Sequence, residues 1–243
     1  MNRPVHLTPR PLTRACRALC TGLALLAATA TVTAQDTAIS DDVVRLGILT
    51  DLNGPFADIT GPGSAAAIQM AIDDFGGKVA GKKIELVVAD HQNKADIASS
   101  KAREWFDTGK VDAIMDVAVS APALAVLEVA KQKQKVVIFN GPGLDRLTGD
   151  LCMPSTVHYV YDTYALANVT ASAITARGGK DWFFITADYA FGHSLQEQAS
   201  AVVTAQGGKV LGAARHPIAA TDFASFLISA QNSKARSEEH TSE

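Results

Sequence analysis

Residues 43–89 run VVRLGILTDLNGPFADITGPGSAAAIQMAIDDFGGKVAGKKIELVVA. Two apolar, β-branched runs, Val43–Thr50 and Ile84–Ala89, enclose a segment in which Ile68, Ile72 and Phe75 recur at helical spacing. Short continuous apolar runs are typical of strands buried in parallel sheets, and recurrence at i, i+4 and i+7 predicts a helix. The stretch therefore predicts a strand–helix–strand unit of an α/β fold.

The same alternation continues beyond this unit. Further strands are expected at 111–117, 136–139, 182–186 and 210–214, with helical patterns between them. Because strand–helix–strand crossovers are almost always right-handed, the helices should cover both faces of each sheet. We predict an α/β fold of two Rossmann-like lobes with parallel sheets, a first lobe at 43–158 and a partial second lobe at 159–235.

The first 34 residues differ from the rest of the chain. Four arginines and no acid precede an apolar stretch, and Val32 and Ala34 place small residues before Gln35. This order is typical of a cleavable signal peptide and predicts a mature N-terminus at Gln35 and a periplasmic location. A membrane-spanning helix is the alternative, but the uninterrupted apolar part is shorter than the ~20 residues that a bilayer requires.

Charge and cysteine content narrow the class of protein. The chain has 22 basic and 25 acidic residues, and without the four leader arginines 18 basic residues remain, a formal charge of −7. No basic patch suggests a nucleic-acid partner. Two of the three cysteines lie in the leader, so Cys152 would be alone after cleavage and the fold would depend on its core rather than on a disulfide.

Ligands of open α/β sheets bind at the carboxyl ends of the strands. After the third predicted strand, Ser120 begins a helix whose free backbone N–H groups and positive dipole end suit a carboxylate. Ser120 could instead be no more than a helix cap, and the spacing leaves both interpretations open. After the fourth strand, the segment from Gly141 to Gly143 lets backbone amides approach a ligand closely.

Signals of catalysis are weak. The loop after the first strand lacks the dinucleotide and P-loop glycine patterns. Gly192 to Gln196 resembles the start of a nucleophile elbow, but Gln196 stands where the final glycine is needed. The histidines lack metal-ligand spacing. We therefore expect no enzyme activity, no catalytic residue, no cofactor and no metal site.

Several segments together resemble a known family. They are the run from Val44 to Ala98, Ser120, the stretch from His158 to Ala167, the stretch from Asp188 to Gly192, and Asp222-Phe223. In this order, behind a predicted signal peptide, they are similar to type I periplasmic solute-binding proteins of the leucine/isoleucine/valine-binding class, the substrate-binding components of ABC transporters. The resemblance covers residues 43–235 and implies a truncated member of that family.

The resemblance also implies the ligand site. Members of the family hold a ligand carboxylate with the hydroxyl and backbone of the residue that matches Ser120 and with backbone groups of the loop that matches Gly141 to Gly143. Ala121, next to Ser120, is expected at the ligand as well. Phe56, Tyr161, Tyr189 and Phe191 would then form apolar walls. The sequence departs from the amino-acid-binding pattern at Gly143, where a threonine is expected, and at Phe191, where a tyrosine is usual. Both departures remove a polar group and favour a small aromatic or aliphatic carboxylate or amide.

The implied function is that of an extracytoplasmic substrate-binding component of an ABC importer. Its partners would be a small amino-acid-like, carboxylate or amide ligand and the membrane permease. A ligand-sensing regulatory domain of the same fold is the alternative, and such domains normally lack an export signal.

The end of the chain raises a separate expectation. Residues 236–243 resemble a translated sequencing adapter and predict a non-native tail after Ala235. A second lobe that stops there would have two clear strands, an open sheet edge and exposed Phe223, Phe226 and Leu227.

Overall fold

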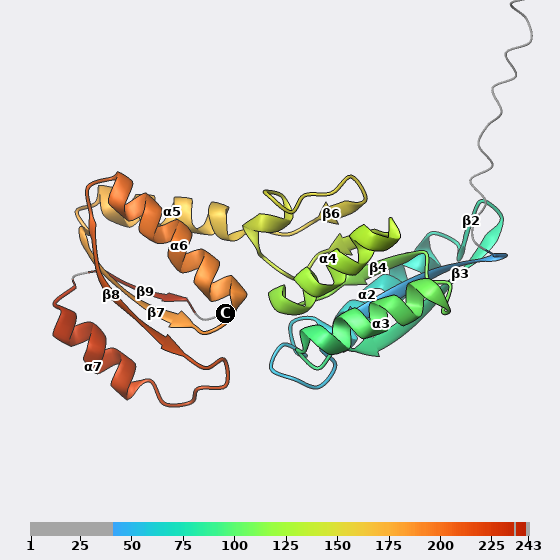
Figure 1. Cartoon of the computed structure of the whole chain (residues 1–243), viewed down its shortest axis with the longest axis horizontal. Helices are drawn as coiled ribbons and strands as arrows, with labels where there is room; N and C mark the ends of the chain where they lie inside the picture. The colour runs from blue at the N-terminus through green and yellow to red at the C-terminus, as the bar shows by residue number, and fades with distance from the viewer. Residues whose placement is uncertain (1–40, 236, 242–243) are drawn as a thin grey trace, which may run out of the picture. The chain divides into compact units, whose positions relative to one another are not determined.

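The first sheet has six strands and contains the central strand β1 (Val43–Thr50). The computed structural model describes residues 41–235 and 237–241, so the predicted signal peptide lies outside the described residues. Strand order is β2-β3-β1-β4-β5-β6, and β2 alone among them is antiparallel to its neighbour. Figure 1 labels β2, β3, β4 and β6 of this sheet. The other strands are β2 (Lys78–Val79), β3 (Lys82–Asp90), β4 (Ala113–Asp116), β5 (Val136–Phe139) and β6 (Thr156–His158). The strands predicted at 43–50, 84–89, 111–117 and 136–139 are all present.

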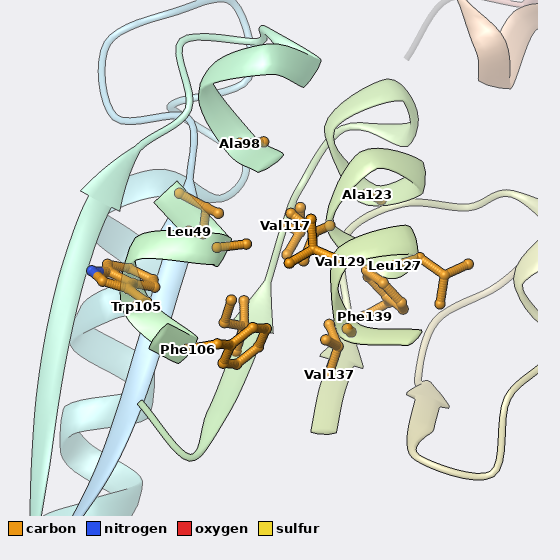
Figure 2. Close-up of a cluster of buried hydrophobic side chains, with 14 of the residues drawn as sticks. Leu49, Ala98, Trp105, Phe106, Val117, Ala123, Leu127, Val129, Val137 and Phe139 are labelled. Carbon is orange, nitrogen blue, oxygen red and sulfur yellow. The ribbon is translucent and has the colours of Figure 1, made fainter. Parts of the chain in front are cut away.

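Three helices connect these strands: α2 (Gly61–Asp74), α3 (Ala95–Asp107) and α4 (Ser120–Lys133). The chain moves from β1 to β3 in one direction along the sheet and from β4 to β5 in the other, so right-handed crossovers put α2 and α4 on opposite faces. Helices α3 and α4 pack along each other. Figure 2 shows the core between them and the sheet, where Trp105, Phe106, Val129 and Phe139 gather.

The second sheet is built around β7 (Asp181–Ala187), with strand order β8-β7-β9 and parallel pairing. Its helices are α5 (Thr163–Ala176), α6 (Ala190–Ala205) and α7 (Ala224–Ser233), and β8 spans Lys209–His216. Successive residues of β7 point to opposite faces. Trp182 and Phe184 pack with residues of α5 and α6, whereas Phe183 and Ile185 pack with Ala230 of α7.

The structure corrects the expectation of a two-stranded second lobe. Strand β9 (Ser237–Thr241), inside the predicted tail, pairs in parallel with β7 from Trp182 to Thr186. Strand β7 is therefore a central strand. Phe223 and Phe226, which were expected to be exposed, are half-buried and pack against His216, with ring centroids 4.8 and 5.9 Å from its ring. Leu227 remains 39% exposed.

The described residues belong to one compact unit of the chain, which contains both sheets. Between β5 and α5 the chain forms a 3₁₀ helix, η1 (Asp145–Leu147), and then β6, the edge strand of the first sheet. Tyr159 N donates to Phe139 O at 2.7 Å, and Thr163 N donates to Gly143 O at 2.8 Å. These two bonds hold the end of β6 and the start of α5 beside the carboxyl end of β5.

Candidate functional site

A pocket of about 370 Å³ lies at the carboxyl ends of β1, β4 and β5. The segment after β6 and the start of α6 complete its lining. Its volume is within the usual range for small-molecule sites. The lining residues are Phe56, Ile59, Thr60, Ala118, Val119, Ser120, Asn140, Gly141, Pro142, Gly143, Val160, Tyr161, Tyr189 and Phe191.

Seven of the eight residues predicted for ligand binding line this pocket: Phe56, Ser120, Gly141, Gly143, Tyr161, Tyr189 and Phe191. Ala121 does not; its side chain is exposed at the start of α4. Pro142 also lines the pocket and lies in the segment from Gly141 to Gly143 that was expected at the ligand. The sequence interpretation did not name Ile59, Thr60, Ala118, Val119, Asn140 and Val160 as ligand-binding residues. Ala118, Val119 and Asn140 belong to the loops after β4 and β5, so a wider reading of the same loops would have found them.

Helix α4 begins at the pocket. Val119 is its N-cap, no side chain caps it, and Ser120 is the first helical residue. The interpretation of Ser120 as only a helix cap is therefore wrong. The first N–H groups of a helix have no partner inside the helix and carry the positive end of its dipole. With Ser120 2% exposed and lining the pocket, this end can receive an anionic group of a ligand.

Two glycines set the shape of the pocket floor. A Cβ at Gly141 would lie 2.7 Å from Ala118 Cα, so a side chain there would separate the loops that follow β4 and β5. A Cβ at Gly143 would lie 2.9 Å from Phe191 Cε2 and 3.1 Å from Tyr161 Cε2. A side chain at Gly143 would therefore require the rings of Phe191 and Tyr161 to move.

Aromatic rings form one wall of the pocket. The Tyr189 ring centroid lies 6.1 Å from that of Phe56 and 5.8 Å from that of Phe191. Phe56 is carried by the loop after β1, whereas Tyr189 and Phe191 lie at the start of α6. The wall therefore joins segments that are more than a hundred residues apart in the sequence.

Buried Asp51 orients the loop that carries Phe56. Its Oδ1 accepts from Gly54 N at 2.7 Å, and its Oδ2 accepts from Phe56 N at 3.0 Å and from Asn93 Nδ2 at 2.8 Å. His91, also fully buried, accepts from Asn93 N through Nδ1 at 3.0 Å. Desolvation lowers the pKa of His91 to about 4, against the opposing effect of the Asp51 and Asp90 carboxylates. His91 is thus neutral at neutral pH.

A second cluster connects the pocket floor to α6 through Asp145. Asp145 Oδ1 accepts from Ser194 Oγ at 2.7 Å and from Thr163 Oγ1 at 3.1 Å, and Oδ2 accepts from Gln198 Nε2 at 2.7 Å. The hydroxyls of Thr163 and Ser194 also lie 2.7 Å apart. Because Thr163 N donates to Gly143 O, the cluster fixes α6, and with it Phe191, relative to Gly143.

Asp116, at the end of β4, has an unusual environment. It is 1% exposed, and neither carboxyl oxygen has a hydrogen-bond partner among the described residues. Asp116 and Val117 have φ of 75° and 53°. Left-handed backbone costs a non-glycine residue about 1–2 kcal/mol, so the surrounding structure must hold this turn in place.

Residues 41–235 contain neither a metal-binding cluster nor a membrane-spanning helix. No group of three His, Cys, Asp or Glu side chains in that part of the chain could hold a metal ion. None of its helices has the length and apolar character needed to cross a membrane.

Comparison with known proteins identifies the family. The family model described as periplasmic binding protein matches residues 43–237. The Leu/Ile/Val-binding protein homolog 6 of Brucella abortus (strain 2308) is 28% identical over 198 residues, which cover 80% of this chain and 50% of that protein. The chain thus spans about half the length of the curated relatives it matches.

Solved structures of similar fold agree. A periplasmic binding protein from Burkholderia mallei shares 55% identity, with a TM-score of 0.79 over 83% of this chain and 54% of that one. A branched chain amino acid ABC transporter periplasmic ligand-binding protein from Burkholderia xenovorans LB400 shares 39% identity, with a TM-score of 0.68 over 82% and 54%.

A solute binding protein of an ABC transporter from Rhodopseudomonas palustris BisB5, in complex with 3,4-dihydroxybenzoic acid, shares 25% identity, with a TM-score of 0.72 over 82% and 54%. The α/β architecture, the match across residues 43–237 and these relatives agree: the chain belongs to the periplasmic binding protein family.

Proposed function

We propose that this chain forms the ligand-binding part of an ABC importer and captures a small carboxylate-bearing molecule, aromatic or amino-acid-like, in the pocket beside Ser120. The observation that carries the proposal is the pairing of the α4 N-terminus with the wall of Phe56, Tyr189 and Phe191. The helix terminus suits a carboxylate, and aromatic faces suit a flat apolar body.

Among the two ligand types, the described pocket favours an aromatic carboxylate. None of the described lining residues carries a charge, so on this side of the pocket no acid is present for the ammonium group of an amino acid. The Burkholderia xenovorans relative is described as a branched chain amino acid transporter component, and the Rhodopseudomonas palustris relative was crystallised with 3,4-dihydroxybenzoic acid. The aromatic wall of Phe56, Tyr189 and Phe191 supports a ligand of the second kind.

The proposal includes a location and a partner. Residues 1–34 would direct export to the periplasm, and the lobes at 43–158 and 159–235 would close on the ligand for delivery to a membrane permease. Binding rather than catalysis is the expected role, because no nucleophile–base pair is found among the described residues that line the pocket.

A thermal-shift screen of the full chain tests the proposal. Benzoate, 3,4-dihydroxybenzoate, leucine, glucose and benzamide are compared at equal concentration, since a ligand that binds only the folded state raises the melting temperature. We expect the two aromatic carboxylates to give the largest shifts. A shift with glucose and none with any carboxylate would refute the proposed ligand class.

Ser120→Ala with benzoate is the matched variant for the site itself. A lower shift in the variant than in the wild type would tie the ligand to the α4 terminus. An equal shift would place the ligand elsewhere.

A further inference from the structure

Asp116 lies directly beneath the pocket floor. It pairs with Leu49 of β1 and Phe139 of β5, so it occupies the centre of the sheet at its carboxyl edge. A Cβ at Gly141 would be 3.2 Å from Asp116 Oδ1 and 2.7 Å from Ala118 Cα, and Gly141 and Ala118 both line the pocket. One layer of backbone therefore separates the carboxyl from the ligand space.

The carboxyl has no hydrogen bond to stabilise an ionised form. The hydroxyls of Thr50 and Ser64 lie close enough to lower its pKa, but neither forms a hydrogen bond with either oxygen. Thr50 Oγ1 instead donates to Thr60 Oγ1 and accepts from Gly61 N, both at 3.2 Å. Burial outweighs these hydroxyls and raises the pKa of Asp116 above its ordinary value.

Charged neighbours do not compensate. Just after β1, Asp51 follows Thr50, but its carboxylate is bonded to Gly54, Phe56 and Asn93. On the β5 side, Asn140 accepts from Asp116 N through Oδ1 at 3.0 Å and leaves the carboxyl untouched. Ser64 is the α2 group that faces it, and no charged side chain of the described residues contributes to its raised pKa. An unpaired buried carboxylate is so costly that such a group takes up a proton instead.

We infer that Asp116 is a specificity-determining residue: as a neutral carboxyl beneath the floor, it leaves the positive end of α4 available to the ligand's carboxylate. Ionised, it would oppose an anion bound at Ser120 across a poorly screened interior. This inference rests on the proposed function, in which the ligand is an anion at that helix end.

A pH dependence of binding follows. An anion above Asp116 favours its protonated form, so binding is tightest at low pH, where the carboxyl is already neutral. Above the pKa of Asp116, binding must take up a proton, and affinity should fall by up to about tenfold per pH unit. If the ligand keeps the same charge across the pH range, the change in affinity reports the titration of a group in the protein.

Benzoate is the probe, because its single carboxylate stays ionised from pH ~5.5 to ~9. Calorimetry on the full chain gives the dissociation constant across this range, and buffers of different ionisation enthalpy give the protons taken up on binding. The wild type should lose affinity and take up protons as pH rises. Asp116→Asn mimics the neutral acid, so its affinity should be flat and its proton uptake zero. The exposed Asp74→Asn on α2 is the matched control and should behave as the wild type.

Two results would overturn the inference: a wild type whose affinity for benzoate is independent of pH, without proton uptake and without a protonated-carboxyl infrared band at neutral pH, or an Asp116→Asn variant that keeps the wild-type slope. Proton uptake by the wild type needs no variant, so a variant that fails to fold leaves the test intact. If benzoate binds at no pH, the proposed ligand class fails instead. The infrared spectrum of the ligand-free chain then decides the charge of Asp116. A protonated-carboxyl band at neutral pH supports the neutral form, and a spectrum without that band overturns it.

Discussion

Replacing Asp145 by alanine removes the acceptor that joins η1 to α5 and α6. Three side-chain hydrogen bonds are lost, two of them at 2.7 Å, to Ser194 and Gln198. Hydrogen bonds to a charged group contribute about 1.5–3 kcal/mol each, and the half-buried position of Asp145 favours the lower figure. Thr163 and Ser194 still bond to each other, so little is added for stranded hydroxyls. Counting the two short bonds, we expect a loss of about 3 kcal/mol of stability.

A loss of this size should lower the melting temperature of a chain this long by about 6–12 °C. Asp145→Asn keeps one acceptor oxygen and should lose about half as much. Asp145→Ala should also weaken ligand binding, because the start of α6 carries Phe191. The control is Asp150→Ala, which breaks only the exposed pair with Arg146 and should leave the melting temperature unchanged.

The assay is differential scanning calorimetry of the full chain and the three variants, followed by calorimetric titration with benzoate. The reasoning is refuted if the melting temperature of Asp145→Ala equals that of the Asp150→Ala control. It is refuted in part if stability falls but the affinity for benzoate does not, since α6 would then hold its place without the cluster.

Three other changes test the site and the fold. Ser120→Ala should weaken benzoate binding by about 1–2 kcal/mol through loss of a charge-assisted bond, and an unchanged dissociation constant in titration calorimetry would contradict this. Gly143→Thr should lower the free energy of unfolding in urea by about 1–3 kcal/mol, because a Cβ at this position would lie 2.9 Å from Phe191 Cε2. Adding Phe191→Leu should restore part of that stability. An unchanged stability of Gly143→Thr would show that the aromatic rings move aside freely. His91 has a folded-state pKa of about 4, against an ordinary value of 6.5. As pH falls, the unfolded chain therefore binds a proton at this histidine before the folded chain does. The free energy of unfolding should fall by up to about 3 kcal/mol as pH drops from about 6.5 to about 4. Urea midpoints should show this slope in the wild type and not in His91→Gln, and an equal slope in both would exclude His91 as its source.

The regular part of the fold could be predicted from the sequence because its signals are local. Val43–Thr50 and Val136–Phe139 begin and end where their apolar runs do. Strands β2 and β6 have two and three residues, too few for any periodicity to be visible, and they join the sheet through pairing with β3 and β5. Strand β9 has a polar sequence and owes its place to the free edge of β7.

The pocket was predictable to the extent that strand ends mark it. Ser120 and Gly141 lie in the loops that follow strands, and the family resemblance supplied the aromatic positions. Asp116 could not be found in this way, since its environment depends on a left-handed turn and on hydroxyls brought by β1 and α2. The Asp145 cluster likewise depends on contacts across 18 to 53 residues of chain, which no local pattern records.

The two tryptophans give each sheet its own optical reporter. Trp105, 7% exposed, lies on α3 against the first sheet, where a Cβ at Gly47 would come 2.6 Å from its ring. Trp182, fully buried on β7, donates from Nε1 to Gly179 O at 2.9 Å. Neither lines the pocket, so ligand binding should leave their emission nearly unchanged.

Single-tryptophan variants, Trp105→Phe and Trp182→Phe, therefore allow the unfolding of each sheet to be followed separately by fluorescence. Coincident transitions would mean that the sheets unfold as one cooperative unit. If the transitions are separate, comparing the unfolding midpoint of each sheet with and without ligand would show which sheet the ligand stabilises. The reporting tryptophan would not itself contact the ligand.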